Sequence, residues 1–173
     1  MNILELILFI LPAYVANAAP VILGGKTPID LGQQLGDKKR IFGKSKTIRG
    51  FVAGVASGTI VGAILALSIP QFLPALSLND KIAISFLLSL GAMAGDLFGS
   101  FLKRRNGMAS GQESPISDKL WFLAGALLFA FPIYSGKITL GLIDIIFLGV
   151  LTFFLHIAFN RIAHFLKLKK VPW

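Results

Sequence analysis

The sequence predicts an all-α polytopic membrane protein with five transmembrane helices, folded as a single domain over residues 1–173. Three observations predict this fold: the composition, long apolar blocks, and the distribution of positive charge. The chain is 55% hydrophobic and only 14% charged, with a mean hydropathy of +0.77, whereas a soluble domain carries about 25% charged residues. These values exclude a disordered chain, a coiled coil and a soluble globular domain. Because the chain has no cysteine, disulfides and cysteine nucleophiles are excluded as well.

Five apolar blocks approach the roughly 20 residues that a helix needs to cross about 30 Å of hydrocarbon. They cover residues 2–23, 50–76, 82–102, 120–134 and 138–165. The first block has a small-residue stretch at Ala16–Ala18, but no positive segment precedes it, so we expect a retained helix rather than a cleaved signal peptide. The second helix is expected to stop near Pro70. Its small residues, at Gly54, Ser57, Gly58 and Gly62, predict close helix–helix contact.

Positive charge predicts the orientation of these helices. Of the 17 Lys and Arg residues, 15 lie in the segments after the first and third blocks or after the core of the fifth, and only Lys81 and Lys137 lie on the other side. We therefore expect a protein of the cell membrane. The positive-inside rule places its N-terminus outside the cell and its C-terminus in the cytoplasm. The chain has a formal net charge of +9, and we expect its surplus cations to interact with the anionic membrane face and with phosphate ligands. No nucleic acid partner is expected.

The third block ends in a polar segment that indicates chemistry. Asp96 lies in or near the end of an apolar span, where an ionised carboxylate is costly unless it is paired or binds a metal. On a helix, Asp96, Ser100 and Lys103 share one face, and Arg104 and Arg105 follow. A carboxylate beside three cations suits a divalent metal with a polyphosphate. The alternative is an Asp–Lys pair that closes the helix end.

The next segment adds a second carboxylate. Gly107 and Gly111 allow backbone N–H groups to approach a phosphate, and Asp118 falls in the first turn of the fourth block. An aspartate at a helix start is also favoured by the helix dipole alone. However, Asp96 and Asp118 end and begin adjacent spans on the same side, so they could hold one or two Mg²⁺ ions.

The loop after the first block contains Lys44, Lys46, Thr47 and Arg49, which resemble a phosphate-binding loop in chemistry without the spacing of a Walker A motif. The two lysines and the arginine could clamp phosphates, or they could be ordinary positive-inside charge. Asn17 either faces a polar cavity or is a plain helix-end residue.

Other polar residues of the spans receive structural interpretations. His156 and His164 have no partner at metal-ligand spacing and are interpreted as packing or interface residues. The chain shows no Ser/His/Asp arrangement and no HExxH motif, so hydrolytic chemistry has no support.

Residues 95–118 read GD-L-F-GS-F-x-KRR-x-G-x-x-x-G-x-x-x-P-x-x-D, and this pattern resembles the archaeal CDP-archaeol synthase family. Residues 12–17, followed by Pro20, and residues 43–50 match the family as well, and the likeness spans nearly the whole chain. One departure is Lys119 after Asp118, where the family pattern has Gln.

The resemblance implies a membrane cytidylyltransferase. CTP and 2,3-bis-O-geranylgeranylglyceryl phosphate, an isoprenoid glyceryl phosphate lipid of the bilayer, would give the CDP-activated lipid and pyrophosphate with Mg²⁺. Asp96 and Asp118 would be metal ligands and, with Lys46 and Lys103, catalytic. The substrate-binding residues would be Asn17, Lys44, Lys46, Thr47, Arg49, Ser100, Lys103, Arg104, Arg105, Gly107 and Gly111.

Two other functions remain open from the residues. A small transporter or channel would use Asp96 as its ion-coupling site, but the polar residues cluster in loops and no inverted repeat is visible. A CDP-alcohol phosphotransferase would show an Asp-rich signature, and the acidic residues here are scattered.

Overall fold

The structure, a computed structural model, describes residues 1–110, 112, 114 and 117–168, with residues 117–119 described by their backbone alone. Its regular elements in this part of the chain are helices, as predicted, joined by loops that contain two isolated β-bridges. The helices are α1 (Ile3–Ala18), α2 (Pro20–Leu23), α3 (Ile48–Ser68), α4 (Leu78–Arg105), α5 (Ser117–Tyr134) and α6 (Leu142–Phe165).

Four segments are long and apolar enough to cross a membrane: Ile3–Leu23, Ile48–Ser68, Leu78–Arg105 and Leu142–Phe165. The fourth predicted span is helical too, but its apolar part, Leu120–Tyr134, is shorter. The helical character of all five blocks is therefore confirmed, whereas the fifth crossing stays a prediction.

The helix boundaries follow local signals. Asn2 and Glu5 form a capping box that starts α1, and Thr47 caps α3 by accepting a hydrogen bond from the Gly50 N–H at 3.1 Å. Helix α3 ends at Ser68, just before Pro70, as predicted. The first block was expected to be one helix, but it is divided at Ala19, because Pro20 begins α2 at a position where a missing N–H is tolerated.

Close backbone contact holds the bundle together. Gly54, Gly58 and Gly62 are buried along one face of α3, and a Cβ added at Gly58 would lie 2.4 Å from the Pro12 carbonyl oxygen of α1. The predicted close contact is thus confirmed. Helices α4 and α5 approach in the same way, since a Cβ at Gly91 would lie 2.3 Å from the Gly125 carbonyl oxygen.

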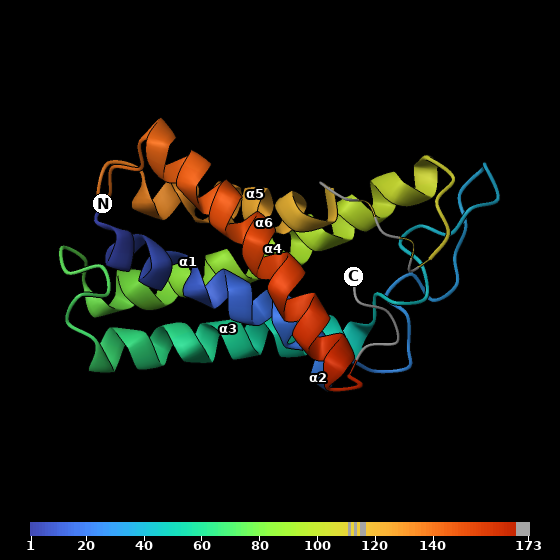
Figure 1. Cartoon of the computed structure of the whole chain (residues 1–173), viewed down its shortest axis with the longest axis horizontal. Coiled ribbons are helices and arrows are strands. Elements are labelled where there is room, and N and C mark those ends of the chain that lie inside the picture. Colours follow the sequence, from blue (N-terminus) through green and yellow to red (C-terminus); the bar gives the residue numbers. More distant parts are fainter. Residues whose placement is uncertain (111, 113, 115–116, 169–173) are drawn as a thin grey trace.

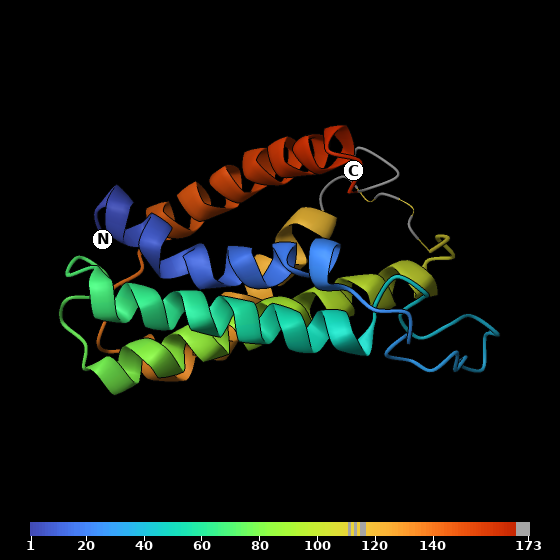
Figure 2. The same ribbon diagram turned by 90° about the horizontal axis from the view of Figure 1, so that it is seen from below.

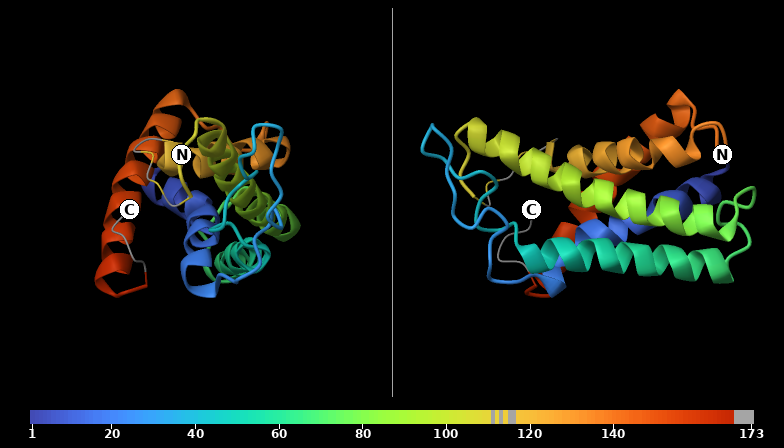
Figure 3. Two further views of the ribbon diagram at one scale, coloured as in Figure 1. Left: turned by 90° about the vertical axis from the view of Figure 1, so that its right-hand side faces the viewer. Right: turned by 180° about the vertical axis from the view of Figure 1, so that it is seen from behind.

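The helices alternate in direction, so the chain has two distinct ends (Figures 1 and 2). The loop of residues 24–47 and residues 106–110 lie at one end, which we call the loop end. The N-terminus and the short connections 69–77 and 135–141 lie at the other, and α4 runs between the two ends (Figure 3). The two predicted basic loops therefore meet, while the orientation of the loop end toward the cytoplasm stays a prediction.

Helix α6 is the least buried of the four candidate spans. Only 11% of its apolar window is buried inside the protein, against 50% for α4. Polar side chains join it to α1: Tyr14 and Thr152 share a hydrogen bond of 2.7 Å between their hydroxyl oxygens. This helix therefore exposes most of its apolar surface.

Candidate active site

An ion pair joins the two predicted halves of the site. Lys46 Nζ lies 2.5 Å from Asp96 Oδ2, so the residue before the cap of α3 reaches the interior of α4. Both side chains are about one-quarter exposed, at 25% and 24%. The pair remains accessible to a ligand, and it confirms that these two polar segments come together.

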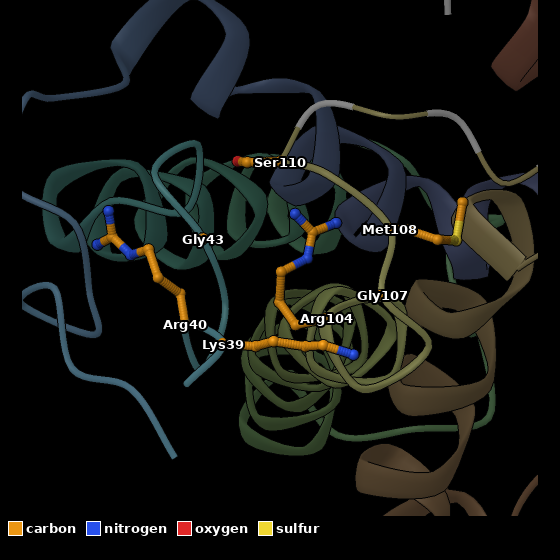
Figure 4. Close-up of a pocket in the computed structure, with 7 residues that line it drawn as sticks. All are labelled: Lys39, Arg40, Gly43, Arg104, Gly107, Met108 and Ser110. Atoms are coloured by element: carbon orange, nitrogen blue, oxygen red, sulfur yellow. The ribbon is translucent and has the colours of Figure 1, made fainter. Parts of the chain in front are cut away.

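A basic pocket of about 210 Å³ lies at the loop end, between the loop of residues 24–47 and the end of α4 (Figure 4). Its lining consists of Lys39, Arg40, Gly43, Arg104, Gly107, Met108 and Ser110. Figure 4 shows the Arg104 guanidinium and the Lys39 side chain on one side of Gly43, and the Arg40 guanidinium on the other. A pocket with these cations suits anionic groups such as phosphates.

Two glycines in left-handed backbone conformations shape this pocket. Gly43 has a φ of +104° and Gly107 a φ of +78°, a region that L side chains rarely adopt. A Cβ at Gly43 would lie 3.0 Å from Ser110 Oγ and 3.5 Å from Arg104 Nη1. The two loops thus approach each other closely at Gly43.

Arg105 fastens the first loop to α4. Its guanidinium pairs with Asp37 Oδ1 at 2.6 Å and donates to the carbonyl oxygens of Arg40 and Lys39 at 2.6 and 3.2 Å. It also lies 5.3 Å from the centre of the Phe101 ring. Arg105 therefore has a clear structural role, and its predicted contact with phosphate stays a prediction.

Asp30 is a buried carboxylate in the same loop that sequence reasoning did not select. It is paired with Arg40 and accepts backbone N–H groups from Gly43, Phe42 and Gly32 at 3.0, 3.1 and 3.1 Å. Burial raises the pKa of this carboxyl, but the Arg40 guanidinium and the three N–H groups lower it more, so its pKa falls well below the usual range. Asp30 is therefore held as a carboxylate.

The remaining residues of the first loop lie near the site in different roles. Thr47 caps α3 and also accepts the Gly25 N–H at 3.1 Å, so its hydroxyl organises the backbone beside Lys46. Lys44 and Arg49 are exposed, and Arg49 packs over Gly25. Their predicted contacts with substrate stay predictions.

The other predicted residues belong to α1, α4 and the segment after it. Ser100 and Arg104 are buried, at 5% exposure each, and Lys103 Nζ donates to the Gln112 carbonyl oxygen at 3.4 Å. Asn17 Nδ2 lies 3.2 Å from His156 Nε2, so the amide of α1 faces a polar partner on α6.

Gly111 and the Asp118 side chain lie outside the described residues, although the backbone places Asp118 in the first turn of α5. In the part of the chain that is described, no group of three or more His, Asp or Glu side chains is gathered for a metal. Asp96 supplies carboxylate oxygens, the donor type that Mg²⁺ prefers, and a magnesium site shared with substrate phosphates needs only one or two carboxylates. The residues present thus fit the predicted ion.

Sequence reasoning missed Asp30, Lys39, Arg40 and Ser110 as residues of the site. The two cations were counted as surface charge, because a sequence does not show that the loop folds back onto α4. The signal that the sequence offered was Gly43 within a basic segment, since a glycine allows the backbone to approach a ligand or a second loop closely.

The bundle and its loop end define the class of protein first: a multi-pass membrane protein with a cation-lined pocket beside an Asp–Lys pair. Comparison with known proteins then defines the family. The family described as "CarS-like: CDP-archaeol synthase" matches residues 1–173, and the chain belongs to this family. It is therefore an enzyme, a CTP-dependent cytidylyltransferase of archaeal lipid biosynthesis.

Curated relatives cover almost the whole chain. The chain is 47% identical to a CDP-archaeol synthase of Pyrococcus furiosus, over 99% of this chain and 98% of that protein. It is 40% identical to a CDP-archaeol synthase of Aeropyrum pernix, over 99% and 93%. A solved structure, described as an intramembrane enzyme for archaeal membrane lipid biosynthesis, is 38% identical with a TM-score of 0.81, covering 92% of this chain and 94% of that one.

Proposed function

We propose that the protein transfers the cytidylyl group of CTP to 2,3-bis-O-geranylgeranylglyceryl phosphate, giving the CDP-activated lipid and pyrophosphate. The observation that supports this most is the meeting of a basic pocket and the Lys46–Asp96 pair at one end of a membrane bundle. Arg104 lies eight residues after Asp96 on one continuous helix, or about 12 Å along its axis. In this proposal a single CTP contacts both the Lys46–Asp96 pair and the basic pocket.

The reaction needs charge neutralisation more than a base. An oxygen of the lipid phosphate attacks the α-phosphorus of CTP, and the bond from that phosphorus to the bridging oxygen breaks with its electron pair leaving on pyrophosphate. A phosphate monoester is already anionic at neutral pH, so no strong proton acceptor is required. Catalysis then consists mainly of positioning and electrostatic stabilisation.

The site residues have corresponding roles in this proposal. Lys39 and Arg104 hold the β- and γ-phosphates in the basic pocket, with Gly43 and Gly107 allowing close approach of the backbone. Lys46 lies beside Asp96 and offers its ammonium to the reacting phosphates. Mg²⁺, held by Asp96 and Asp118, would withdraw charge from the phosphate oxygens.

The membrane arrangement follows from the same proposal. The loop end faces the cytoplasm, where CTP is available, and the N-terminus lies outside the cell membrane. Helix α5, which packs along α4, also crosses the membrane and brings the number of spans to five. The isoprenoid chains stay in the bilayer while the lipid phosphate enters the loop end.

The test is nucleotide incorporation by the purified protein. Labelled CTP and Mg²⁺ are supplied with the isoprenoid glyceryl phosphate, and with phosphatidate in parallel. We expect a CDP-lipid and pyrophosphate, with the ether lipid preferred. Absence of product with either lipid, in protein shown to be folded, contradicts the proposal, and ion uptake by reconstituted vesicles without nucleotide would favour a transporter instead.

Both proposed metal ligands can be tested in the same assay. Asp96→Asn and Asp118→Asn keep the size of each side chain but remove its charge. Each is expected to lower turnover strongly and to raise the Mg²⁺ concentration needed for half-maximal activity. Full activity of either variant removes that residue from the metal site.

A further inference from the structure

Asp30 is the most enclosed carboxylate among the described ion pairs. Its side chain is 0% exposed, although the surrounding segment, residues 31–39, is exposed to solvent throughout. An ionised carboxylate is costly to bury unless charges and hydrogen-bond donors compensate it. The loop supplies that compensation with one guanidinium and three backbone N–H groups.

Apart from the Gly32 N–H, these donors come from residues 40–43, the segment that forms one wall of the basic pocket. Arg40 and Gly43 line the pocket, and Phe42 lies between them. The Arg40 guanidinium is turned to Asp30, away from the Arg104 guanidinium, so it stands behind the wall (Figure 4). Asp30 thus binds the Arg40 guanidinium, which Figure 4 shows pointing away from Arg104.

Arg105 holds the same wall from α4. It donates to the carbonyl oxygens of Lys39 and Arg40, and the Arg105 carbonyl oxygen accepts from Lys39 Nζ at 3.3 Å. The segment of residues 39–43 is therefore fixed from two directions. Without Asp30, the attachment to α4 at Lys39 and Arg40 remains, but the turn that brings Gly43 against Ser110 and Arg104 loses its support.

We infer that Asp30 is a positioning residue for the nucleotide: with Arg40 it holds Lys39 and the Gly43 backbone beside Arg104, so that the pocket keeps the shape that binds the phosphates of CTP. Asp30 itself does not touch the substrate. The inference rests on the proposed function, because it assigns the CTP phosphates to this pocket. A merely structural role would lower stability or turnover without a selective effect on CTP.

The test separates the two substrates kinetically. Asp30→Asn keeps the side-chain shape and removes the charge that pairs with Arg40. The KM for CTP is expected to rise about tenfold, while the kcat at saturating CTP and the KM for the lipid stay within about twofold of the wild type. Asp80→Asn is the matched control, since Asp80 pairs with Lys137 at the opposite end, and its KM for CTP should not change.

A double variant tests whether Asp30 acts through Arg40. Arg40→Gln alone should raise the KM for CTP to the same extent, and Asp30→Asn with Arg40→Gln should be no worse than either single variant, because the residues act as one unit. If the increases in the KM for CTP were additive in the double variant, Asp30 would not act through Arg40. If Asp30→Asn does not fold, Arg40→Lys replaces it, since a lysine cannot bond both oxygens of Asp30 in the same geometry.

The outcomes distinguish this inference from the proposed function. An unchanged KM for CTP in folded Asp30→Asn, or an equal loss with every substrate in kcat alone, overturns the inference and leaves the synthase activity standing. If the wild type makes no CDP-lipid, the proposed function fails first. Calorimetric titration with CTP then decides the inference separately: about tenfold weaker binding by Asp30→Asn supports it, and equal binding overturns it.

Discussion

Two ion pairs of the same chemistry lie on α4, one toward each end of the bundle. At the loop end, Lys46 pairs with Asp96 in the interior of the helix, and at the other end Lys137 pairs with Asp80 at 2.9 Å in the first turn. Asp80 is favoured there by the helix dipole and by the Ser77 cap, whereas Asp96 has no such local support. The difference teaches that position, rather than residue type, separates a site from a structural contact.

The surroundings of the two pairs differ in the same way. Lys137 is 46% exposed and reaches Asp80 from a short connection, so this pair resembles many surface salt bridges. The pair of Lys46 and Asp96 is more enclosed, and the pocket with Arg104 lies further along the same helix. In the Lys46–Asp96 pair, a phosphate can replace the carboxylate as partner of the lysine, or a metal ion can replace the ammonium as partner of the aspartate.

The largest expected effect tests the two aspartates against each other. Asp96→Asn should lower kcat by about 100-fold or more, because it removes a charge that acts on the reacting phosphates. Asp80→Asn should stay within about twofold of wild-type activity and lower thermal stability slightly. Steady-state kinetics and thermal unfolding of both variants test this difference. Similar activities of Asp96→Asn and Asp80→Asn would show that the two aspartates do not differ in function.

The two lysines should differ by a smaller factor. Lys46→Gln is expected to lower kcat/KM by roughly 10- to 100-fold, since it removes a cation from the phosphates and leaves Asp96 without its partner. Lys137→Gln should change kcat/KM little. Lys46→Arg sharpens the contrast: a guanidinium keeps the charge with a different geometry, so we expect partial activity. Full activity of Lys46→Gln would make this pair a structural contact.

The helix caps beside the pairs offer a third comparison. Thr47→Ala and Ser77→Ala each remove the oxygen that accepts the first free N–H groups of a helix, at a cost of about 1 kcal/mol in unfolding free energy. Only Thr47→Ala should also reduce activity, by several-fold, because Thr47 fixes the backbone next to Lys46. Equal activity of the two variants, measured at equal folded fraction, would contradict this.

The smallest effect concerns pH. The pKa of Asp30 is lowered in the folded protein, so the stability that it contributes is fully present above the ordinary carboxyl pKa of about 3.9 and is lost only as the pH falls through the lower folded value. Hydrogen exchange of the loop amides should therefore be independent of this group between pH 5 and 8. Protection of the Gly43 amide that weakened within that range would show that another group controls the loop.

The sequence was informative wherever a regular pattern decided the structure. Helices, the end of α3 before Pro70 and the placement of the two basic loops at one end followed from hydropathy, proline and charge. The break at Ala19 was missed because apolar content alone does not show where a proline divides a helix and where, as at Pro12, it is accommodated inside one.

The loop residues could not be predicted for a different physical reason. Asp30 and Arg40 stand in a polar segment whose composition is that of an exposed loop, and their pairing arises only when the chain folds back on itself, as at the Pro28–Thr47 bridge. The contact of Asn17 with His156 joins the first and last helices, so neither residue shows its partner locally. Short-range patterns do not encode such contacts.

The unbroken course of α4 from Leu78 to Arg105 has a last consequence, which concerns insertions and deletions. Each residue advances a helix by about 100°, so one residue inserted between Asp96 and Arg104 would turn the arginine about a quarter of the way around the axis. The helix would remain, and so would every side chain of the site. Asp96 and Arg104, now about 80° apart around the axis, would then lie on opposite sides of the helix, so the site tolerates substitution in this stretch far better than a change in its length.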